Sequence, residues 1–85
     1  MTWKTIWSET AQKQLERLPK KDIKRILLKI KDDVEKDPYQ HVARLVGQPF
    51  YRLRVGHYRI IMQILNGKML ILILQVKKRS KAYKK

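Results

Sequence analysis

The sequence predicts a small α+β fold, in which two helices from the N-terminal half pack on one face of an antiparallel sheet. Three observations predict it. Apolar residues recur at helical spacing up to about residue 36, and they alternate with polar residues after Pro49. Two turn signals then divide the C-terminal half into three strands. With 85 residues, the chain is expected to form a single domain over residues 1–85 with a thin core.

The N-terminal segment predicts a strand and then two helices. Residues 2–7 are rich in aromatic and β-branched side chains, which favour a strand. Ser8 is suited to cap a first helix. The apolar face of this helix consists of Ala11, Leu15 and Leu18. Pro19 separates it from a second helix over residues 20–36. The apolar stripe of the second helix consists of Ile23, Ile26, Leu27, Ile30 and Val34.

The segment after the second helix predicts a connection. Pro38 disfavours helical backbone at Asp37 and so ends the helix. Residues 39–49 are expected to form the connection, with room for one helical turn. The three strands that follow are predicted to form a C-terminal meander, and the N-terminal strand joins them in one sheet.

The first two strands of the meander are predicted to meet at a tight turn. Gly56-His57 follows the alternating residues YRLRV, and glycine in first place suits a two-residue type II′ turn. Counting outward from this turn pairs Arg54 with Arg59. Because side chains alternate between faces, one face carries Leu53, Val55, Tyr58, Ile60 and Met62. The opposite face carries Arg52, Arg54 and Arg59.

The second and third strands are predicted to meet at Asn66-Gly67, a dipeptide that favours a type I′ turn. Counting from this turn pairs Ile60 with Ile73 and Arg59 with Leu74. The residues expected on the helix-covered face are then Met69, Ile71 and Ile73. Those expected on the arginine face are Leu70, Leu72 and Leu74.

A sheet face that mixes arginines with leucines is typical of a binding surface. Arg54 and Arg59 are like-charged neighbours, which is unfavourable unless an anion lies between them. Arginine also suits bidentate recognition of phosphate. Three simpler interpretations stay open: arginines that face only solvent, leucines that pack under residues 39–49, and a contact between two copies of the chain.

The composition points to an anionic partner. Lysine and arginine number 21 and aspartate and glutamate number 7, which gives a net charge of +14. This charge favours nucleic acid first, an acidic protein second and an anionic membrane surface last. Cysteine is absent, which excludes disulfides and thiolate metal sites. Neither a signal peptide nor an apolar run near the ~20 residues of a membrane span is visible, so we expect a cytoplasmic protein without membrane attachment.

The C-terminal segment is strongly basic. It contains Lys77, Lys78, Arg79 and Lys81, with Tyr83 among them. A basic tail is either solvated or part of a binding surface. Tyr83 is accordingly either an anchor for the terminus or a functional residue.

Taken together, these segments resemble the RelE/ParE toxin superfamily, and within it the RelE-like messenger RNA interferases. The resemblance rests on LPKKDIKRI, LRVGHYRII, ILILQV and KKRSKAY, and it covers essentially the whole chain. It implies a compact RelE-like fold. It also implies a toxin of a type II toxin–antitoxin system, which cuts messenger RNA in the ribosomal A site and so inhibits translation. The implied partners are the ribosome, messenger RNA and a cognate RelB-like antitoxin, which is an acidic or amphipathic helical protein.

The same resemblance implies roles for individual residues. Arg59 corresponds to the arginine that holds the scissile phosphate. Arg79 corresponds to a basic residue that stabilises charge on the phosphate or assists the leaving oxygen. Tyr83 corresponds to a tyrosine that stacks on a base or takes part in proton transfer. Arg52 completes the expected catalytic set. The residues expected to contact RNA or phosphate are Arg54, Lys77, Lys78 and Lys81.

One departure from the family leaves the general base open. The family often carries lysines where this chain has Arg52 and Arg54, and Phe50 stands at a further lysine position. Arginine, with a pKa above ~12, is a poor proton acceptor. The remaining candidates are Tyr83, Lys77, Lys78 and His57, unless the ribosome supplies part of the chemistry.

The expected reaction is attack of a ribose 2′-hydroxyl on its neighbouring phosphate. It needs a proton acceptor, a donor to the leaving 5′-oxygen and positive charge on the phosphorane. The arginines supply the charge, and acidic residues are too few for a two-metal nuclease, so we expect a metal-independent endoribonuclease without a cofactor. Two alternatives stay open: a ParE-like toxin that inhibits gyrase, and a non-catalytic RNA-binding module.

Overall fold

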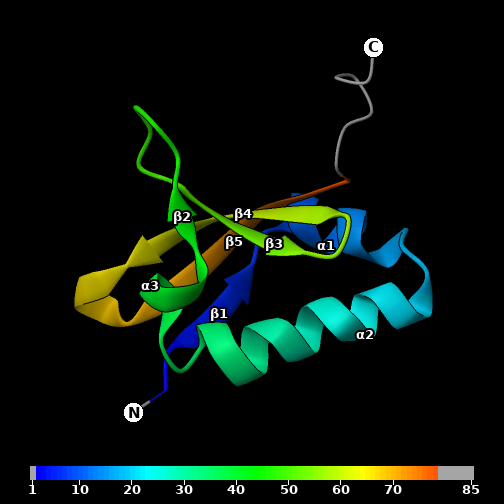
Figure 1. Cartoon of the computed structure of the whole chain (residues 1–85), viewed down its shortest axis with the longest axis horizontal. Helices are drawn as coiled ribbons and strands as arrows, with labels where there is room; N and C mark the ends of the chain where they lie inside the picture. Colours follow the sequence, from blue (N-terminus) through cyan, green and yellow to red (C-terminus); the bar gives the residue numbers. More distant parts are fainter. Residues whose placement is uncertain (1, 79–85) are drawn as a thin grey trace.

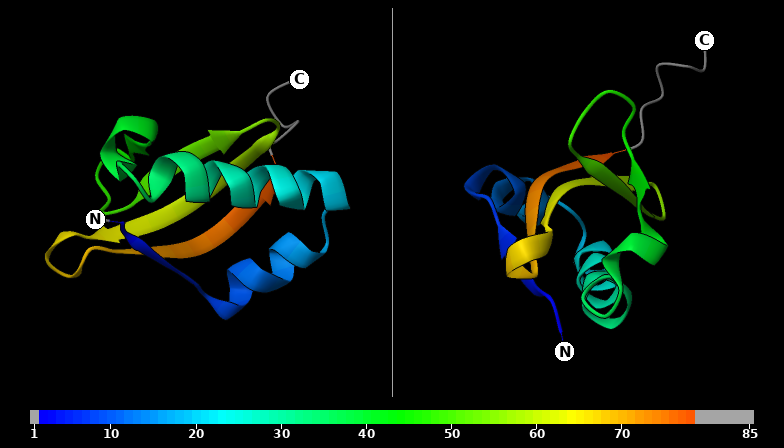
Figure 2. Two further views of the ribbon diagram at one scale, coloured as in Figure 1. Left: turned by 90° about the horizontal axis from the view of Figure 1, so that it is seen from below. Right: turned by 90° about the vertical axis from the view of Figure 1, so that its left-hand side faces the viewer.

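The computed structural model describes residues 2–78, which form one five-stranded mixed sheet with helices on one face (Figure 1). The sheet has the order β1-β5-β4-β3-β2. Its strands are β1 (Lys4–Trp7), β2 (Ala43–Arg44), β3 (Tyr51–Val55), β4 (Tyr58–Leu65) and β5 (Leu70–Lys78). The helices are α1 (Glu9–Glu16), α2 (Lys20–Lys29) and α3 (Pro38–His41). Figure 2 shows α2 across one face of the sheet and α1 alongside β5.

The predicted α+β class with N-terminal helices is confirmed, and the sheet differs from the prediction in two details. β1 pairs with β5 in parallel, so the sheet is mixed rather than antiparallel throughout. The two-residue strand β2 extends the sheet beyond β3 and was not predicted. It lies in the connection, directly after the short helix α3, for which the sequence left room.

The N-terminal elements follow their sequence signals. The Ser8 hydroxyl accepts a hydrogen bond from the Ala11 amide at 3.1 Å, which is the predicted helix cap. Pro19 directly precedes α2. The predicted helix over residues 20–36 does not stay regular, because residues Ile30–Val34 form a π-helical turn. The Glu35 amide donates to the Ile30 carbonyl at 2.8 Å, five residues back.

A single apolar core lies between the helices and the sheet. It includes Ile26, Ile30 and Val34 from the second helix, whereas Leu27 is 43% exposed and was wrongly placed on the buried stripe. The core residues of the strands and α1 are Ala11, Leu15, Leu53, Val55, Tyr58, Ile60, Met62, Ile71, Ile73 and Val76. Within residues 2–78, no helix is long and apolar enough to cross a membrane.

The β3–β4 hairpin has the predicted register. Val55 pairs with Tyr58, and Arg54 pairs with Arg59. Gly56 has φ +59°, as the first position of a type II′ turn requires. A methyl group on Gly56 would lie 2.8 Å from Nη1 of Arg25, so glycine also makes room for that guanidinium.

The β4–β5 connection differs from the predicted type I′ turn. Residues Asn66–Lys68 form a 3₁₀ turn, and the left-handed residue is Met69 with φ 51°. Leu65 therefore pairs with Leu70 across a four-residue loop. The longer loop shifts the pairing by two residues, and a two-residue shift preserves the faces. Ile71 and Ile73 are accordingly buried, as predicted.

A β-bulge then changes the register of β5. Met62 pairs with Ile73, but its neighbour Ile61 pairs with Gln75, which leaves Leu74 as the extra residue. The predicted pairs of Ile60 with Ile73 and Arg59 with Leu74 are therefore wrong. Arg59 instead pairs with Lys77.

Candidate functional site

The candidate site lies on the open face of the sheet, which is the face turned away from α2, and the start of α1 borders it through Ser8 and Thr10. Cross-strand pairing places Arg54, Arg59 and Lys77 in one row over β3, β4 and β5. Arg54 and Lys77 are exposed, and Arg59 is half-buried. Directly opposed side chains on neighbouring strands have Cβ atoms about 4.5–5.5 Å apart. The row therefore concentrates three positive charges over a short distance.

No acidic residue offsets this row among the described residues. The ion pairs within residues 2–78 are Lys13 with Glu9 and Lys29 with Asp33, and both lie on the helices. Like charges placed directly opposite destabilise a sheet, so an anion that binds to the row relieves a repulsion already present in the fold. Two guanidinium groups also provide forked donors that match the oxygens of a phosphate.

A hollow of about 620 Å³ adjoins this row at the β4–β5 end. Arg59 and Lys77 supply its positive charge, and Gln48 and Gln75 supply amide donors and acceptors. The apolar part of its lining consists of Leu45, Phe50, Ile61 and Leu74. Positive charge beside an aromatic and amide-lined surface can hold a phosphate and contact an attached base.

The connection from β2 to β3 forms one wall of this hollow. Leu45, Gln48 and Phe50 all belong to it, and the Leu45 amide donates to the Phe50 carbonyl at 2.9 Å, which closes the loop on itself. Figure 2 shows the loop on the side of the sheet opposite α2. Leu74 contributes to the floor of the same hollow, facing the side that the loop walls off.

Arg52 lies beside the row rather than in it. Its register partner on β4 is Ile61, and its partner on β2 is Ala43. Together with Arg54 it lines a smaller hollow of about 320 Å³. The other cationic or titratable residues of that hollow are Lys29 and His41. The structure therefore separates Arg52 from the hollow that contains Arg59 and Lys77.

Several predicted residues lie apart from this hollow or outside the described chain. His57 is exposed in the hairpin turn and does not line the hollow. Lys78 follows Lys77 on β5, so alternation directs it to the other face. The positions Arg79, Lys81 and Tyr83 lie outside the described residues.

Tyr58 ties the arginine hairpin to α2. Its hydroxyl donates a hydrogen bond to Oδ2 of Asp22 at 2.6 Å, and its ring is buried. The hydrogen bond to the Asp22 carboxylate, together with burial, raises the pKa of the Tyr58 phenol. Since Arg59 is the next residue on β4, this contact fixes the start of the strand that presents it.

The described residues of the site are better suited to stabilise negative charge than to act as a general acid or base. The hollow contains one amine, Lys77, and its described lining includes neither carboxylate nor imidazole. Within residues 2–78, no group of three or more potential metal ligands occurs. Positive charge aimed at a phosphate is the chemistry that the described side chains provide directly.

Sequence reasoning missed the wall of the hollow and one residue of its floor. Gln48 and Leu45 lie in a loop whose path back over the sheet has no local sequence signal. Gln75 carried a usable signal, because it is the polar interruption in the run LILILQV and stands where the bulge reverses the faces. Phe50 was noted only as a departure from lysine, yet it lines the hollow.

Comparison with known proteins identifies relatives of this fold. The family model described as the ParE toxin of the type II toxin–antitoxin system parDE matches residues 5–83. A chain of the archaeal RelE–RelB complex from Pyrococcus horikoshii is 31% identical and superposes with a TM-score of 0.80. That match covers 95% of this chain and 99% of the archaeal one. No curated protein matches the chain.

Two more distant structures share the fold. A chain of the RelBE2 toxin–antitoxin complex from Mycobacterium tuberculosis is 21% identical, with a TM-score of 0.84 and 93% of each chain covered. A chain of the chromosomal ParDE system from P. aeruginosa is 15% identical, with a TM-score of 0.73. This last match covers 92% of this chain and 97% of the other.

Proposed function

Since the chain belongs to the RelE/ParE superfamily of toxins from type II toxin–antitoxin systems, we propose that it is a ribosome-dependent endoribonuclease of the RelE kind. It cleaves messenger RNA in the ribosomal A site and so inhibits translation. The observation that carries this proposal is the row of Arg54, Arg59 and Lys77 beside a hollow of 620 Å³. That volume lies within the range of about 300–1,000 Å³ typical of small-ligand sites.

The proposed reaction uses this site to stabilise charge. Arg59 holds the scissile phosphate, with Arg54 and Lys77 on either side of it in the row. A ribose 2′-hydroxyl gives up its proton to a general base and attacks the phosphorus. A 2′,3′-cyclic phosphate forms as the bond to the 5′-oxygen breaks, and that oxygen takes up a proton. Arg79 and Tyr83 complete the site in this proposal, Arg79 at the leaving oxygen and Tyr83 as base-stacking or proton-transfer group.

The proposed partner besides the ribosome is a RelB-like antitoxin. The P. horikoshii and M. tuberculosis relatives were crystallised as RelE–RelB and RelBE2 complexes. A chain with net charge +14 suits an acidic partner, because charge complementarity accelerates association and suppresses wrong partners.

Mapping of messenger RNA 5′ ends after induced expression tests the proposal. We expect new ends in register with codons, confined to translated messages. The Arg59→Ala/Tyr83→Ala double variant serves as the inactive comparison, and it should still bind the antitoxin. Cuts on untranslated RNA, or a double variant with full toxicity, would contradict the proposal.

A second function is favoured by one specific finding, namely that the matching family model is that of ParE toxins. In this alternative, the toxin binds and inhibits gyrase and has no catalytic site of its own. It predicts a DNA-damage response on expression, without prior arrest of translation. Purified toxin would then inhibit supercoiling by gyrase, and messenger RNA ends would stay unchanged.

A further inference from the structure

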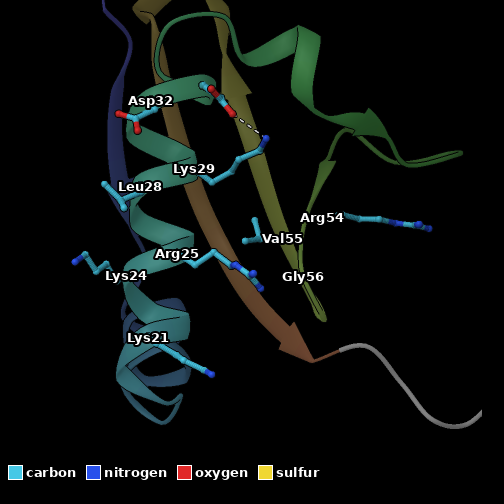
Figure 3. Close-up of a pocket in the computed structure, with 10 residues that line it drawn as sticks. Lys21, Lys24, Arg25, Leu28, Lys29, Asp32, Arg54, Val55 and Gly56 are labelled. Carbon is cyan, nitrogen blue, oxygen red and sulfur yellow. Dashed lines mark ion pairs between the residues drawn. The ribbon is translucent and has the colours of Figure 1, made fainter.

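The row on the open face does not end at Arg54. A groove of about 610 Å³ runs between α2 and the end of β3, and Arg54 lines it as well. The cations that α2 contributes on the hairpin side are Lys21, Arg25 and Lys29, each one helical turn from the next (Figure 3). Figure 3 also shows Lys24 on the opposite side of the helix. The groove is thus a second cationic surface, on the helix side of the hairpin.

Lys21, Arg25 and Lys29 follow one another at four-residue spacing on α2. Like charges at this spacing destabilise a helix. Lys29 is neutralised by Asp33 at 2.7 Å, whereas no ion pair within residues 2–78 involves Lys21 or Arg25. Two cations therefore repel each other along the groove, at a place where an anion would relieve the repulsion.

The hairpin turn joins this groove to the candidate site. Gly56 leaves the space that the Arg25 guanidinium occupies over the turn. Arg54 and Gly56 line both the groove and a small crevice at the hairpin tip, and the crevice also contains Arg59. Arg59 in turn lines the hollow on the open face. The three depressions form one path around the tip, and we call its cations the cationic belt: Lys21, Arg25, Arg54, Arg59 and Lys77.

We propose that the cationic belt binds the backbone of a single-stranded RNA segment that continues from the nucleotide held at Arg59, around the hairpin tip and into the α2 groove. We choose RNA over other polyanions because this inference rests on the proposed function. The shape of the path favours a single strand, because the belt turns from one side of the sheet to the other. A flexible strand can follow such a turn, whereas a duplex is stiff over this length.

The groove suits a polyanion better than an amphipathic antitoxin helix. Such a helix needs an apolar floor for its own apolar stripe. The exposed apolar residue at this groove is Leu28, and its side chain points away from the hairpin (Figure 3). Val55, which also lines the groove, is 5% exposed and already belongs to the core. Asp32 and Asp33 also line the groove, but they are outnumbered by its five cations, so positive charge is still the main feature that the groove offers.

The salt dependence of RNA binding tests the belt. The probe is a 2′-O-methyl RNA of about twenty nucleotides, long enough to fill a single-strand site and unable to undergo 2′-hydroxyl attack. Each phosphate contact contributes about 0.7 to the slope of log K against log salt for a single strand. The Lys21→Gln/Arg25→Gln variant should therefore lower the magnitude of the slope by about 1.4. Its thermal stability should stay at or above the wild-type value, because a repulsion is removed.

The matched control is Lys31→Gln/Lys68→Gln, which removes the same charge from two exposed residues outside the belt. It should keep a slope close to that of the wild type. An equal decrease of the salt slope in both double variants would overturn the proposal. An unchanged slope in Lys21→Gln/Arg25→Gln would also overturn it. A variant that keeps RNA binding but loses affinity for the antitoxin would assign the groove to the protein partner and also overturn the proposal. Because the probe cannot be cleaved, a failed cleavage experiment would count against the proposed function and leave this result standing.

Discussion

Arg59 on β4 and Lys77 on β5 are direct cross-strand partners because β5 carries a bulge at Leu74. Strict alternation from Ile73, which is buried, would direct residues 75 and 77 toward the core. The extra residue reverses this pattern, so that Val76 is buried and Lys77 joins Arg59 on the open face. The Ser8 hydroxyl donates to the Leu74 carbonyl at 3.1 Å and so satisfies the bulged residue. The bulge thus builds the candidate site.

The reversed faces of β5 predict unequal effects of two neighbouring alanine substitutions. Val76 is 6% exposed, so Val76→Ala should lower the free energy of unfolding by about 1.5–3 kcal/mol through lost burial and a cavity. Gln75→Ala, on the open face, should change it by less than about 0.5 kcal/mol. Urea denaturation measures both. If Gln75→Ala proved the more costly, β5 would lack the bulge.

The contrast between the two hairpins shows what the sequence could predict. Gly56 has a backbone conformation that few other residues tolerate, so it fixes a two-residue turn and with it the pairing of Arg54 with Arg59. Asn66-Gly67 gave a similar local signal but a longer loop formed. The bulge at Leu74 then depends on Ser8 and on the pairing with β4, which are distant in sequence. Contacts between residues so far apart in the sequence cannot be predicted from local sequence patterns.

The same distinction holds for the helices and for the candidate site. The Ser8 cap and, apart from Leu27, the apolar stripe of the second helix depend on local sequence, and both were predictable. The π-helical turn at Ile30–Val34 keeps an apolar spacing that a regular helix also explains. The arginines of the site were visible as alternating charges on a strand. The hollow beside them was not, because Phe50 and Gln48 reach it only through the tertiary path of their loop.

The glycines of the two turns should respond differently to alanine. Gly56→Ala should cost about 1–2 kcal/mol, because it forces φ near +59° on a residue with a Cβ. Gly67 lacks a positive φ and has open space around its Cα, so Gly67→Ala should be neutral or stabilise by up to about 1 kcal/mol. Met69→Gly should likewise stabilise, because Met69 is the left-handed residue. If Gly67→Ala instead lowered the melting temperature strongly, Gly67 would have a positive φ, as in the type I′ turn that the sequence predicted.

Arg59 should matter for function far more than its charge alone explains. In the proposed reaction, Arg59→Ala should lower ribosome-dependent cleavage by about 10²–10³-fold, as loss of one preorganised donor does. Arg59→Lys keeps the charge but loses the forked donor, so its activity should be intermediate. Arg17→Ala is the matched control, since it removes the same charge from an exposed residue at the end of α1. Single-turnover cleavage on programmed ribosomes gives the rates, and equal losses in Arg17→Ala and Arg59→Ala would refute the assigned role.

The contact of Tyr58 with Asp22 predicts a pH dependence at the alkaline end. Because its phenol pKa is raised in the folded state, the hydrogen bond stabilises the protein fully below the unfolded value of about 10 and is lost as pH rises through the folded value. Tyr58→Phe should cost about 1.5 kcal/mol near neutral pH. The difference in stability between wild type and variant should shrink above about pH 10. A difference that stays constant from neutral to alkaline pH in urea titrations would contradict this.

Asp33 limits how far the cationic belt extends, because it forms an ion pair with Lys29 at the end of the α2 groove. The hydrogen bond from Lys29 lowers the pKa of the Asp33 carboxyl, so the pair persists as pH falls until that lowered pKa is reached. Asp33→Asn keeps the size of the side chain and releases Lys29 into the groove. If the belt binds RNA there, this variant should add one phosphate contact and steepen the salt slope by about 0.7. Asp37→Asn removes the same charge from an exposed residue outside the groove, and it should leave the slope unchanged. Identical slopes for the two variants would show that Lys29 does not join the belt.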